Sequence, residues 1–292
     1  MFIFVINKNS GKGKTLKVWD EVELYLQSKK VDYQVLVTES KEDVLQLKSL
    51  INNVHTKISG VIAIGGDGTS QEVINQLVDT GYPFSVIPTG SGNDFARARG
   101  LDRNVRREVD RIIGGRQEKI DLMKVDSKYC LTVIGLGFDG VVAQVTNQMG
   151  FKKWLGSFSY IISVLKVLRT YKPSSVELTI DGEYLQYDKV WLIAIANYPY
   201  YGGGMKICPN ATSQDGLVDI CIVHGQSRWK LLLLFPSVFK GEHVKQKGVN
   251  ILQGREIIVN ADKQLIIHGD GEIIGVTPIT ITIEKNALNI IS

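Results

Sequence analysis

The chain has 292 residues, 44% of them hydrophobic and 22% charged, which excludes a disordered protein and suggests two packed domains. The net charge of +4 fits a phosphate-bearing ligand or an anionic membrane surface, and fits equally well a charge that only keeps the protein in solution. Three distant cysteines (Cys130, Cys208 and Cys221) exclude a disulfide framework or zinc ribbon, and no run approaches the roughly 18 apolar residues of a membrane span.

The first 122 residues alternate between two hydrophobic patterns. Helices are expected at Thr15–Lys30, Lys41–Asn53 and Gln71–Val78, and strands at Phe2–Ile6, Tyr33–Val37, Val61–Ile64 and Phe84–Ile87. Such alternation predicts an α/β domain with a parallel sheet that is covered on both faces. Because ligands of these sheets bind at the carboxyl ends of the strands, the loops that follow strands should carry the function.

After about residue 123 short β-rich runs dominate. Strands are expected at Tyr129–Ile134, Ser175–Ile180, Val190–Ala196, Leu217–Val223, Glu256–Asn260, Leu265–His268 and Ile279–Ile283. Asp181-Gly182 and Asp270-Gly271 are hairpin-turn signals, and helices are expected near Trp154–Arg169 and Trp229–Phe239. The second half is therefore predicted as an antiparallel β domain with inserted helices. The predicted domains are 1–122 and 123–292, with the last residues able to return to the first domain.

The loop after the first strand runs from Asn7 to Thr15 and contains glycines and lysines. A strict P-loop is excluded because it needs a glycine where Lys8 stands. A looser anion-binding loop remains, since the glycines lead from a strand into a helix.

The loop after the third strand belongs to the stretch VIAIGGDGTSQEVIN, residues 61–75. Gly65, Gly66 and Gly68 would let backbone N–H groups converge on phosphate oxygens. Asp67 among them is intelligible if a Mg²⁺ ion lies between the carboxylate and the phosphates. The alternative is a strand–turn–helix junction in which Thr69 and Glu72 form a capping box. That alternative leaves the three glycines around Asp67 unexplained.

A third loop, Pro88–Arg97, again combines glycines, hydroxyls and an acid, Asp94. Arg97 could meet a phosphate. Asp121, near the domain boundary, is expected from its residues alone to be an ordinary solvated acid. The remaining arginines are expected to form a solvated face without the interleaved aromatics of a nucleic-acid site, so no nucleic acid is expected: Arg99, Arg103, Arg106, Arg107 and Arg111.

Two further segments attract attention. Residues 135–140 read GLGFDG and match a dinucleotide fingerprint. A dinucleotide site would also need an acid further along, and none occurs between Asp139 and Glu177. We therefore expect a loop of the cleft near the substrate and no NAD site.

The acid-free stretch that follows includes Phe151-Lys152-Lys153-Trp154-Leu155 and continues as an apolar helical pattern with lysines and arginines. Together with Arg228-Trp229-Lys230-Leu231 it fits a membrane interface, or equally a helix that covers a sheet.

GGDGT followed by PTGSGNDFAR resembles the diacylglycerol kinase catalytic-domain family, particularly the soluble bacterial lipid kinases, and is similar to sphingosine and ceramide kinases. The resemblance covers most of the chain. It continues through Gly202–Met205, Cys208–Ala211, Asp215–Asp219 and His268–Glu272. GGDGT alone is shared with phosphofructokinases and NAD kinases, so the later motifs make the lipid kinase interpretation specific. One departure is Lys8, where family members usually have proline after the asparagine.

The resemblance implies a phosphofructokinase-like first domain, a β-sandwich-like second domain, and ATP and Mg²⁺ as cofactors. The residues implied to bind ATP are Asn7, Ser10, Gly11, Lys12, Gly13, Lys14, Thr38, Gly65, Gly66, Asp67, Gly68, Thr69, Ser70, Gln71, Ser91 and Asn93. Asp67, Asp94 and Asp121 would surround a catalytic Mg²⁺. Asp215 with the backbone of Thr212 and Leu217 would hold a second, structural Mg²⁺.

Phosphoryl transfer to an alcohol also needs a base near the acceptor hydroxyl. The residues alone leave Asp270 and Glu272 balanced between an Asp-Gly turn and a base, and the resemblance implies a catalytic role without deciding which acid takes the proton. His268 beside them is expected to be structural.

The predicted function is an ATP-dependent lipid kinase that phosphorylates a membrane lipid, with diacylglycerol and phosphatidic acid as the expected pair. A cytoplasmic protein with peripheral membrane contact is expected, and whether it forms a homodimer stays open. The alternatives are an NAD kinase, a sugar phosphate kinase, or a non-catalytic nucleotide- or lipid-binding regulator on the same fold.

Overall fold

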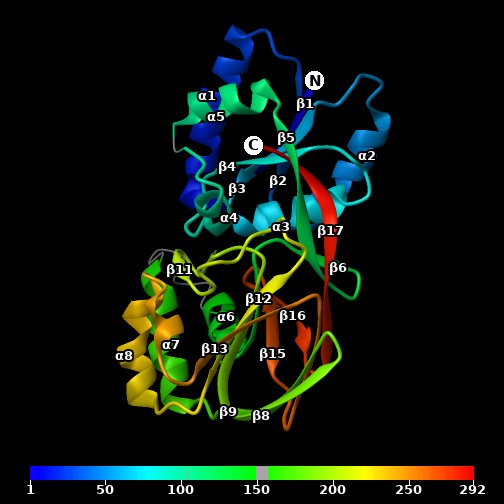
Figure 1. The fold of residues 1–292 in the computed structure, drawn as a ribbon. Coiled ribbons are helices and arrows are strands. Elements are labelled where there is room, and N and C mark those ends of the chain that lie inside the picture. Colours follow the sequence, from blue (N-terminus) through cyan, green and yellow to red (C-terminus); the bar gives the residue numbers. More distant parts are fainter. Residues whose placement is uncertain (103, 149–156) are drawn as a thin grey trace. The chain divides into compact units, whose positions relative to one another are not determined.

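The computed structural model describes residues 1–102, 104–148 and 157–292 (Figure 1). These residues form two compact units, one of residues 1–120 with 285–292 and the other of residues 121–284. The chain passes from one unit to the other within β5 (Gln117–Val125) and within β17 (Ile279–Ile291).

The first unit is built on a parallel sheet whose strands follow the order β17-β4-β3-β1-β2. Its strands are β1 (Phe2–Asn7), β2 (Tyr33–Thr38), β3 (Gly60–Gly65), β4 (Phe84–Pro88) and the end of β17. Its helices are α1 (Lys14–Ser28), α2 (Gln46–Asn53), α3 (Asp67–Leu77), α4 (Asp94–Ala98) and α5 (Val105–Gly114), with 3-10 turns at Ser10–Gly13 and Glu42–Leu45.

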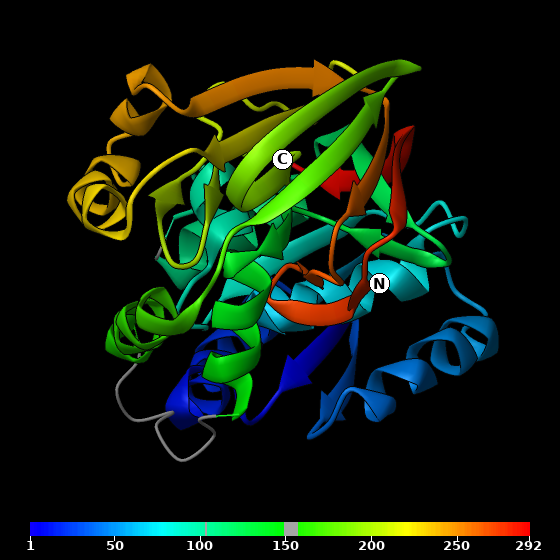
Figure 2. The same cartoon turned by 90° about the horizontal axis from the view of Figure 1, so that it is seen from below.

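Both faces of this sheet are buried, as the unbroken apolar runs in its strands predict. Phe4 and Ile6 of β1 pack with Trp19 of α1 and Val109 of α5. Ile3 and Val5 alternate with them and are fully buried as well. Helices α1 and α5 cover one face of the sheet, whereas α2 and α3 cover the other (Figures 1 and 2).

The second unit is antiparallel. Its sheet follows the order β16-β15-β7-β9-β8-β14-β17, and β12 and β13 continue from β9. The strands are β6 (Lys128–Cys130), β7 (Val133–Gly137), β8 (Ser174–Ile180), β9 (Glu183–Ala196), β12 (Val218–His224), β13 (Val249–Gly254), β14 (Glu256–Ala261), β15 (Ile266–Gly269) and β16 (Glu272–Val276), with a separate pair β10 (Tyr200–Tyr201) and β11 (Met205–Lys206). The helices are α6 (Phe138–Gln148), α7 (Ser157–Thr170) and α8 (Arg228–Val238), with a 3-10 turn at Glu242–Lys245.

Strand β9 shows how this unit is layered. Ile193 and Ile195 point into a core made by other strands. Ala194 and Ala196 alternate with them and face a second core that α8 joins through Leu231 and neighbouring residues. A strand that is apolar on both faces therefore lies between a strand layer and a helix layer.

The predicted fold class is confirmed, with corrections to single elements. The expected helix Gln71–Val78 begins earlier, at Asp67, because glycine and aspartate at its start have low helix propensity and hid the first turn. The expected strand Tyr129–Ile134 is two strands, separated at residues 131–132. Helix α6 and strands β5, β13 and β16 were not predicted.

Candidate functional site

In the first unit the loops that follow β1, β3 and β4 meet, as the parallel sheet requires. Gly66 and Gly90 touch through their backbones, since a Cβ on Gly90 would lie 2.5 Å from the Gly66 Cα. Gly11, at φ +59°, approaches Thr89 so closely that a Cβ would lie 2.3 Å from its carbonyl oxygen. These glycines are needed because any side chain would push the loops apart.

Hydrogen bonds fix the three loops to one another. The Thr89 N–H donates to the Gly65 carbonyl at 2.8 Å, and the Thr15 and Thr89 hydroxyls lie 2.8 Å apart. The Asn7 amide donates to the Thr69 hydroxyl at 3.1 Å. The loops thus form one rigid surface at the carboxyl edge of the sheet.

The capping box predicted from Thr69 and Glu72 is wrong. Gly66 is the N-cap of α3 and has no side chain to offer, while Thr69 lies inside the helix and accepts a bond from Asn7. The start of α3 therefore lacks a side-chain cap. First-turn N–H groups and the helix dipole make such an end suited to an anion such as phosphate.

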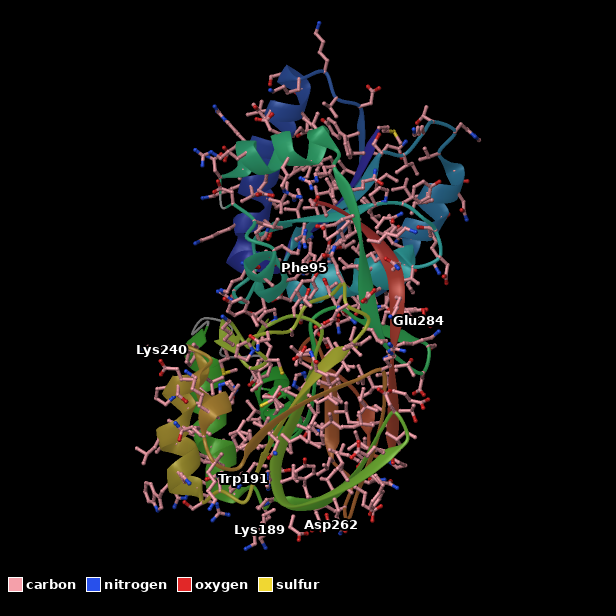
Figure 3. The ribbon with its side chains drawn as sticks, in the orientation of Figure 1. Phe95, Lys189, Trp191, Lys240, Asp262 and Glu284 are labelled. Atoms are coloured by element: carbon pink, nitrogen blue, oxygen red, sulfur yellow. The ribbon has the colours of Figure 1, made fainter. Side chains whose placement is uncertain are left out.

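Two predicted acids lie on the first turns of neighbouring helices. A carboxylate oxygen of Asp67, at the start of α3, accepts from the Phe95 N–H at 3.4 Å, and Phe95 lies in α4 (Figure 3). Asp94, also in α4, is 5% exposed and accepts from Arg97 at 2.6 Å. Arg97, expected to meet a phosphate, is bonded to Asp94 and to the Gly92 carbonyl.

A cavity of about 730 Å³ opens beside these loops, within the range of small-molecule sites. Three residues predicted to bind ATP line it: Lys14, Ser91 and Asn93. The remaining predicted ATP residues in the unit are not part of this lining. Asn93 adopts φ +54° and donates to the Gly90 carbonyl, while its buried Oδ1 has no hydrogen-bond partner among the described residues. An orphaned buried oxygen of this kind calls for a bound water or ligand.

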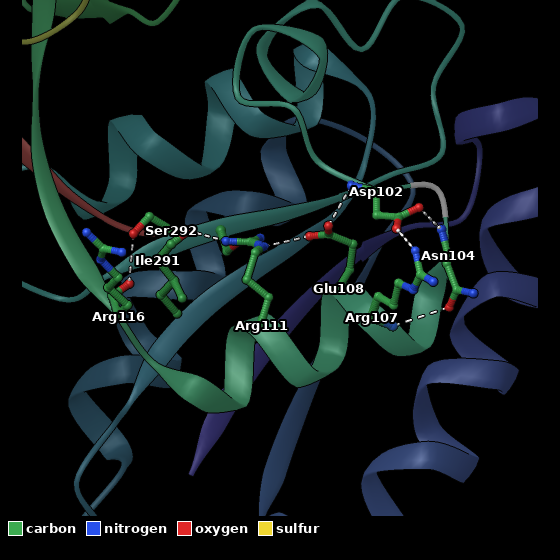
Figure 4. Close-up of polar contacts among 9 residues, drawn as sticks. Asp102, Asn104, Arg107, Glu108, Arg111, Arg116, Ile291 and Ser292 are labelled. Carbon is green, nitrogen blue, oxygen red and sulfur yellow. Dashed lines mark hydrogen bonds and ion pairs between the residues drawn. The ribbon is translucent and has the colours of Figure 1, made fainter.

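An ion pair between the buried Glu108 and the partly buried Arg111 supports the wall of this cavity (Figure 4). Glu108, 3% exposed, accepts from the Asp102 N–H at 2.6 Å and from Arg111 at 2.8 Å. Arg111 also donates to the Ser85 hydroxyl at 2.7 Å and to the Ile291 carbonyl. The expectation of a solvated arginine face is therefore wrong for Arg111. Arg106 and Arg107 are exposed, and Arg99 pairs with Glu118. Arg103 lies outside the described residues.

In the second unit Asp121 is buried, so the expectation of a solvated acid is wrong. Its carboxylate accepts from the Gly216 N–H at 2.8 Å, and its own N–H donates to the Ser213 carbonyl at 2.7 Å. Asp121 thus holds the loop that carries the predicted second metal site. In that loop Thr212 and Asp215 are exposed, and Asp215 accepts from the Leu217 N–H at 3.0 Å.

Asp270 sits in the turn between β15 and β16, and its carboxylate is surrounded by donors. The N–H groups of Leu131, Thr132 and Val133 donate at 2.7, 2.8 and 3.1 Å, and the Thr132 hydroxyl donates as well. Both oxygens are therefore committed to holding the turn against the start of β7. Glu272, the first residue of β16, is half-buried.

A second pair next to this turn was missed by sequence reasoning. His268 Nε2 lies 3.0 Å from Asp139 Oδ2, and both side chains are buried. The expected GLGFDG loop is instead the end of β7 and the first turn of α6. A Cβ on Gly135 would lie 2.3 Å from both atoms of the pair, and one on Gly140 would lie 2.1 Å from the Ile266 carbonyl. The glycines therefore allow close packing around the pair. The signal available in the sequence was a histidine, His268, in one motif and an acid, Asp139, in the other.

The comparisons with known proteins agree along the whole chain. A family model described as the diacylglycerol kinase catalytic domain matches residues 1–125, and one described as the YegS C-terminal NAD kinase beta sandwich-like domain matches residues 132–292. The chain is 32% identical to a diacylglycerol kinase from Mycobacterium tuberculosis, covering 98% of this chain and 93% of that one. A Bacillus subtilis diacylglycerol kinase is 29% identical over 75% of this chain and 72% of its own. A solved diacylglycerol kinase from Bacillus anthracis shares the fold, with a TM-score of 0.74 at 19% identity over 99% of this chain and 96% of that one.

The chain therefore belongs to the diacylglycerol kinase family and is a lipid kinase. Across the described ranges, no helix is both long enough and apolar enough to pass through a bilayer.

Proposed function

We propose that this lipid kinase transfers the γ-phosphate of ATP to the free hydroxyl of diacylglycerol and forms phosphatidic acid. The observation that carries the proposal is the meeting of three glycine-rich loops beside a cavity of about 730 Å³, with Asp67 and Asp94 on adjacent helix starts. The diacylglycerol kinases among its relatives, similar along most of the chain, support this choice of acceptor.

The nucleotide phosphates would lie against the open start of α3, where the glycine contacts leave the backbone accessible. Lys14 would supply a positive charge from the cavity wall, and Ser91 and Asn93 would supply hydrogen bonds. The orphaned Asn93 Oδ1 would find its partner in the nucleotide or its water.

Asp67 and Asp94 would hold the catalytic Mg²⁺. Among the described residues no three His, Cys, Asp or Glu side chains are arranged around one ion. Mg²⁺ is commonly bound by one or two carboxylates, phosphate oxygens and waters. When bound, the ion neutralises charge on the transferred phosphate. The part of Asp121 in this group, and the second ion at Thr212, Asp215 and Leu217, are proposals of the same kind.

For the acceptor hydroxyl we propose Glu272 as the base and Asp270 as the anchor of the turn. A general base must lie within hydrogen-bond reach of the proton that it removes. Both Asp270 oxygens already accept bonds from residues 131–133. Glu272 follows the same turn at the start of β16.

The lipid would be reached at a membrane surface through α8. Leu231, Leu234 and Phe235 pack inward, so Trp229 and Leu233, 79% and 81% exposed, form an apolar outer face. No acid occurs between Arg228 and Lys240, which follows α8 (Figure 3). Basic residues beside exposed tryptophan and leucine suit an anionic bilayer. On α7, Ile162 and Leu165 are exposed beside Lys166; the predicted contacts at Lys152 and Lys153 lie outside the described residues.

An acceptor panel tests the proposal. Purified protein, Mg²⁺ and ATP labelled in the γ-phosphate would be mixed with diacylglycerol in micelles, with NAD, or with fructose 6-phosphate. We expect label in phosphatidic acid alone. Label in NADP or in a sugar bisphosphate would contradict the proposed acceptor, and no transfer to any lipid in a wider panel would favour a non-catalytic regulator.

A further inference from the structure

We propose that Asp139 and His268 are positioning residues that hold the turn carrying Glu272, a role that rests on the proposed function of Glu272 as the base. No motif assigns either residue to the reaction. The structure joins α6, which carries Asp139, to β15, which carries His268, directly beside that turn.

Each ring nitrogen of the imidazole has one partner. Asp139 only accepts, so His268 Nε2 carries the hydrogen across the 3.0 Å contact. The Gly271 N–H donates to His268 Nδ1 at 3.3 Å, so Nδ1 carries a lone pair. This arrangement uses both ring nitrogens. A hydrogen on Nδ1 would face the Gly271 N–H and repel it.

The turn is held from two sides. Asp270 adopts φ +51° and Gly271 φ +88°, the left-handed pair of a two-residue hairpin turn that costs energy at a residue other than glycine. Residues 131–133 hold Asp270 from one side. His268 holds the Gly271 N–H from the other. Glu272 is the next residue, and it pairs with Gly269 in the hairpin.

The Asp139–His268 pair is not the most stabilising way to fill this part of the core. Asp139 and His268 side chains are 4% and 5% exposed, and a buried polar pair rarely stabilises a fold more than apolar residues of the same size. Gly135 must also lack a side chain to admit it. The presence of the pair is better explained by placement of the turn, because a misplacement of about 1 Å can lower the rate of a reaction about 100-fold.

Two double variants separate positioning from simple packing. Both contain Asp139→Asn, which removes the buried charge. His268→Asn keeps an oxygen where Nδ1 accepts from Gly271, whereas His268→Gln keeps a donor where Nε2 meets residue 139 and loses the acceptor. Steady-state kinetics with ATP and diacylglycerol, and the free energy of unfolding in urea, would be measured for both.

We expect the His268→Gln double variant to lose about 10- to 100-fold in kcat, with the KM for ATP unchanged. The His268→Asn double variant, which keeps the acceptor for Gly271 but loses the contact with residue 139, should lose less kcat than the His268→Gln double variant, and the two should have similar unfolding free energies. Equal kcat in both variants, or loss of kcat only in proportion to lost stability, would overturn the positioning role. Glu272→Gln is measured beside them: if it keeps full activity, the base assignment fails, which is a separate result.

Discussion

Four aspartates were predicted together from their motifs, and their surroundings in the fold separate them. Asp270 accepts bonds from three consecutive backbone N–H groups. Asp121 holds the loop at Gly216, and Asp94 is buried against Arg97. Asp67 is half-buried at the start of α3 and accepts from the Phe95 N–H. Residue type alone does not assign a role, because the number and kind of donors around each carboxylate decide it.

Arg111 carries a prediction about stability. Replacing it with methionine keeps much of its volume but leaves the Glu108 carboxylate buried without its partner. We expect the free energy of unfolding to fall by about 3–5 kcal/mol, the cost typical of an uncompensated buried charge. Urea denaturation measures it. Adding Glu108→Gln should recover part of the loss, and a single variant as stable as the wild type would show that the pair is not buried in solution.

His243 predicts a pH dependence. It is fully buried, and burial lowers its pKa below the ordinary 6.5, while its hydrogen bond to the Ile207 carbonyl at 2.9 Å partly opposes this. A lowered pKa means that the unfolded chain binds the proton first. Its contribution to stability is therefore complete above pH 6.5 and is lost as the pH falls from there toward the folded pKa.

The matched variant is His243→Gln, whose amide keeps a donor for Ile207 but does not titrate. Unfolding free energies measured between pH 7.5 and 5 should fall more steeply for the wild type than for this variant. Parallel curves would mean that His243 does not titrate differently in the two states.

At the scale of elements, the sequence was informative wherever one pattern dominated. Unbroken apolar strands such as Val61–Ile64 predicted a sheet buried on both faces, and the loops after them were correctly placed at one edge. Helix α6 was missed because GLGFDG resembles a loop, and only contact with Ile266 and His268, far along the chain, explains its glycines. The capping-box prediction was wrong for a similar reason, because the Thr69 hydroxyl accepts a hydrogen bond from Asn7, which is distant in the sequence. Local patterns do not contain such partners.

Helix α8 carries the membrane prediction. Replacing both Trp229 and Leu233 with serine removes apolar side chains that are already exposed, so the fold should be unaffected. We expect binding to vesicles containing anionic phospholipid to fall by about 10-fold or more, because each large apolar group contributes about 1.5–3 kcal/mol when fully buried. Co-sedimentation measures it.

Leu24 on α1, 68% exposed in the other unit, provides the matched control when it is changed to serine. Equal loss of binding in both variants, or no loss in the α8 variant, would show that α8 does not contact the bilayer.

At the scale of the whole molecule, the two units carry different residues of the proposed reaction. The first carries the loops proposed to bind the nucleotide, Asp67 and the cavity. The second carries Glu272, the pair that supports its turn, and the helix proposed to meet the membrane. Each unit matches its own family model. The proposed function depends most on Asp67, because this residue would connect the proposed phosphate site to the proposed Mg²⁺.

The most direct test is therefore the rate of phosphatidic acid formation from ATP and diacylglycerol by the wild type and by Asp67→Asn, at equal Mg²⁺. We expect turnover by the wild type and a loss of at least about 100-fold in the variant, with an unchanged melting temperature. Full activity in a folded Asp67→Asn protein would contradict it.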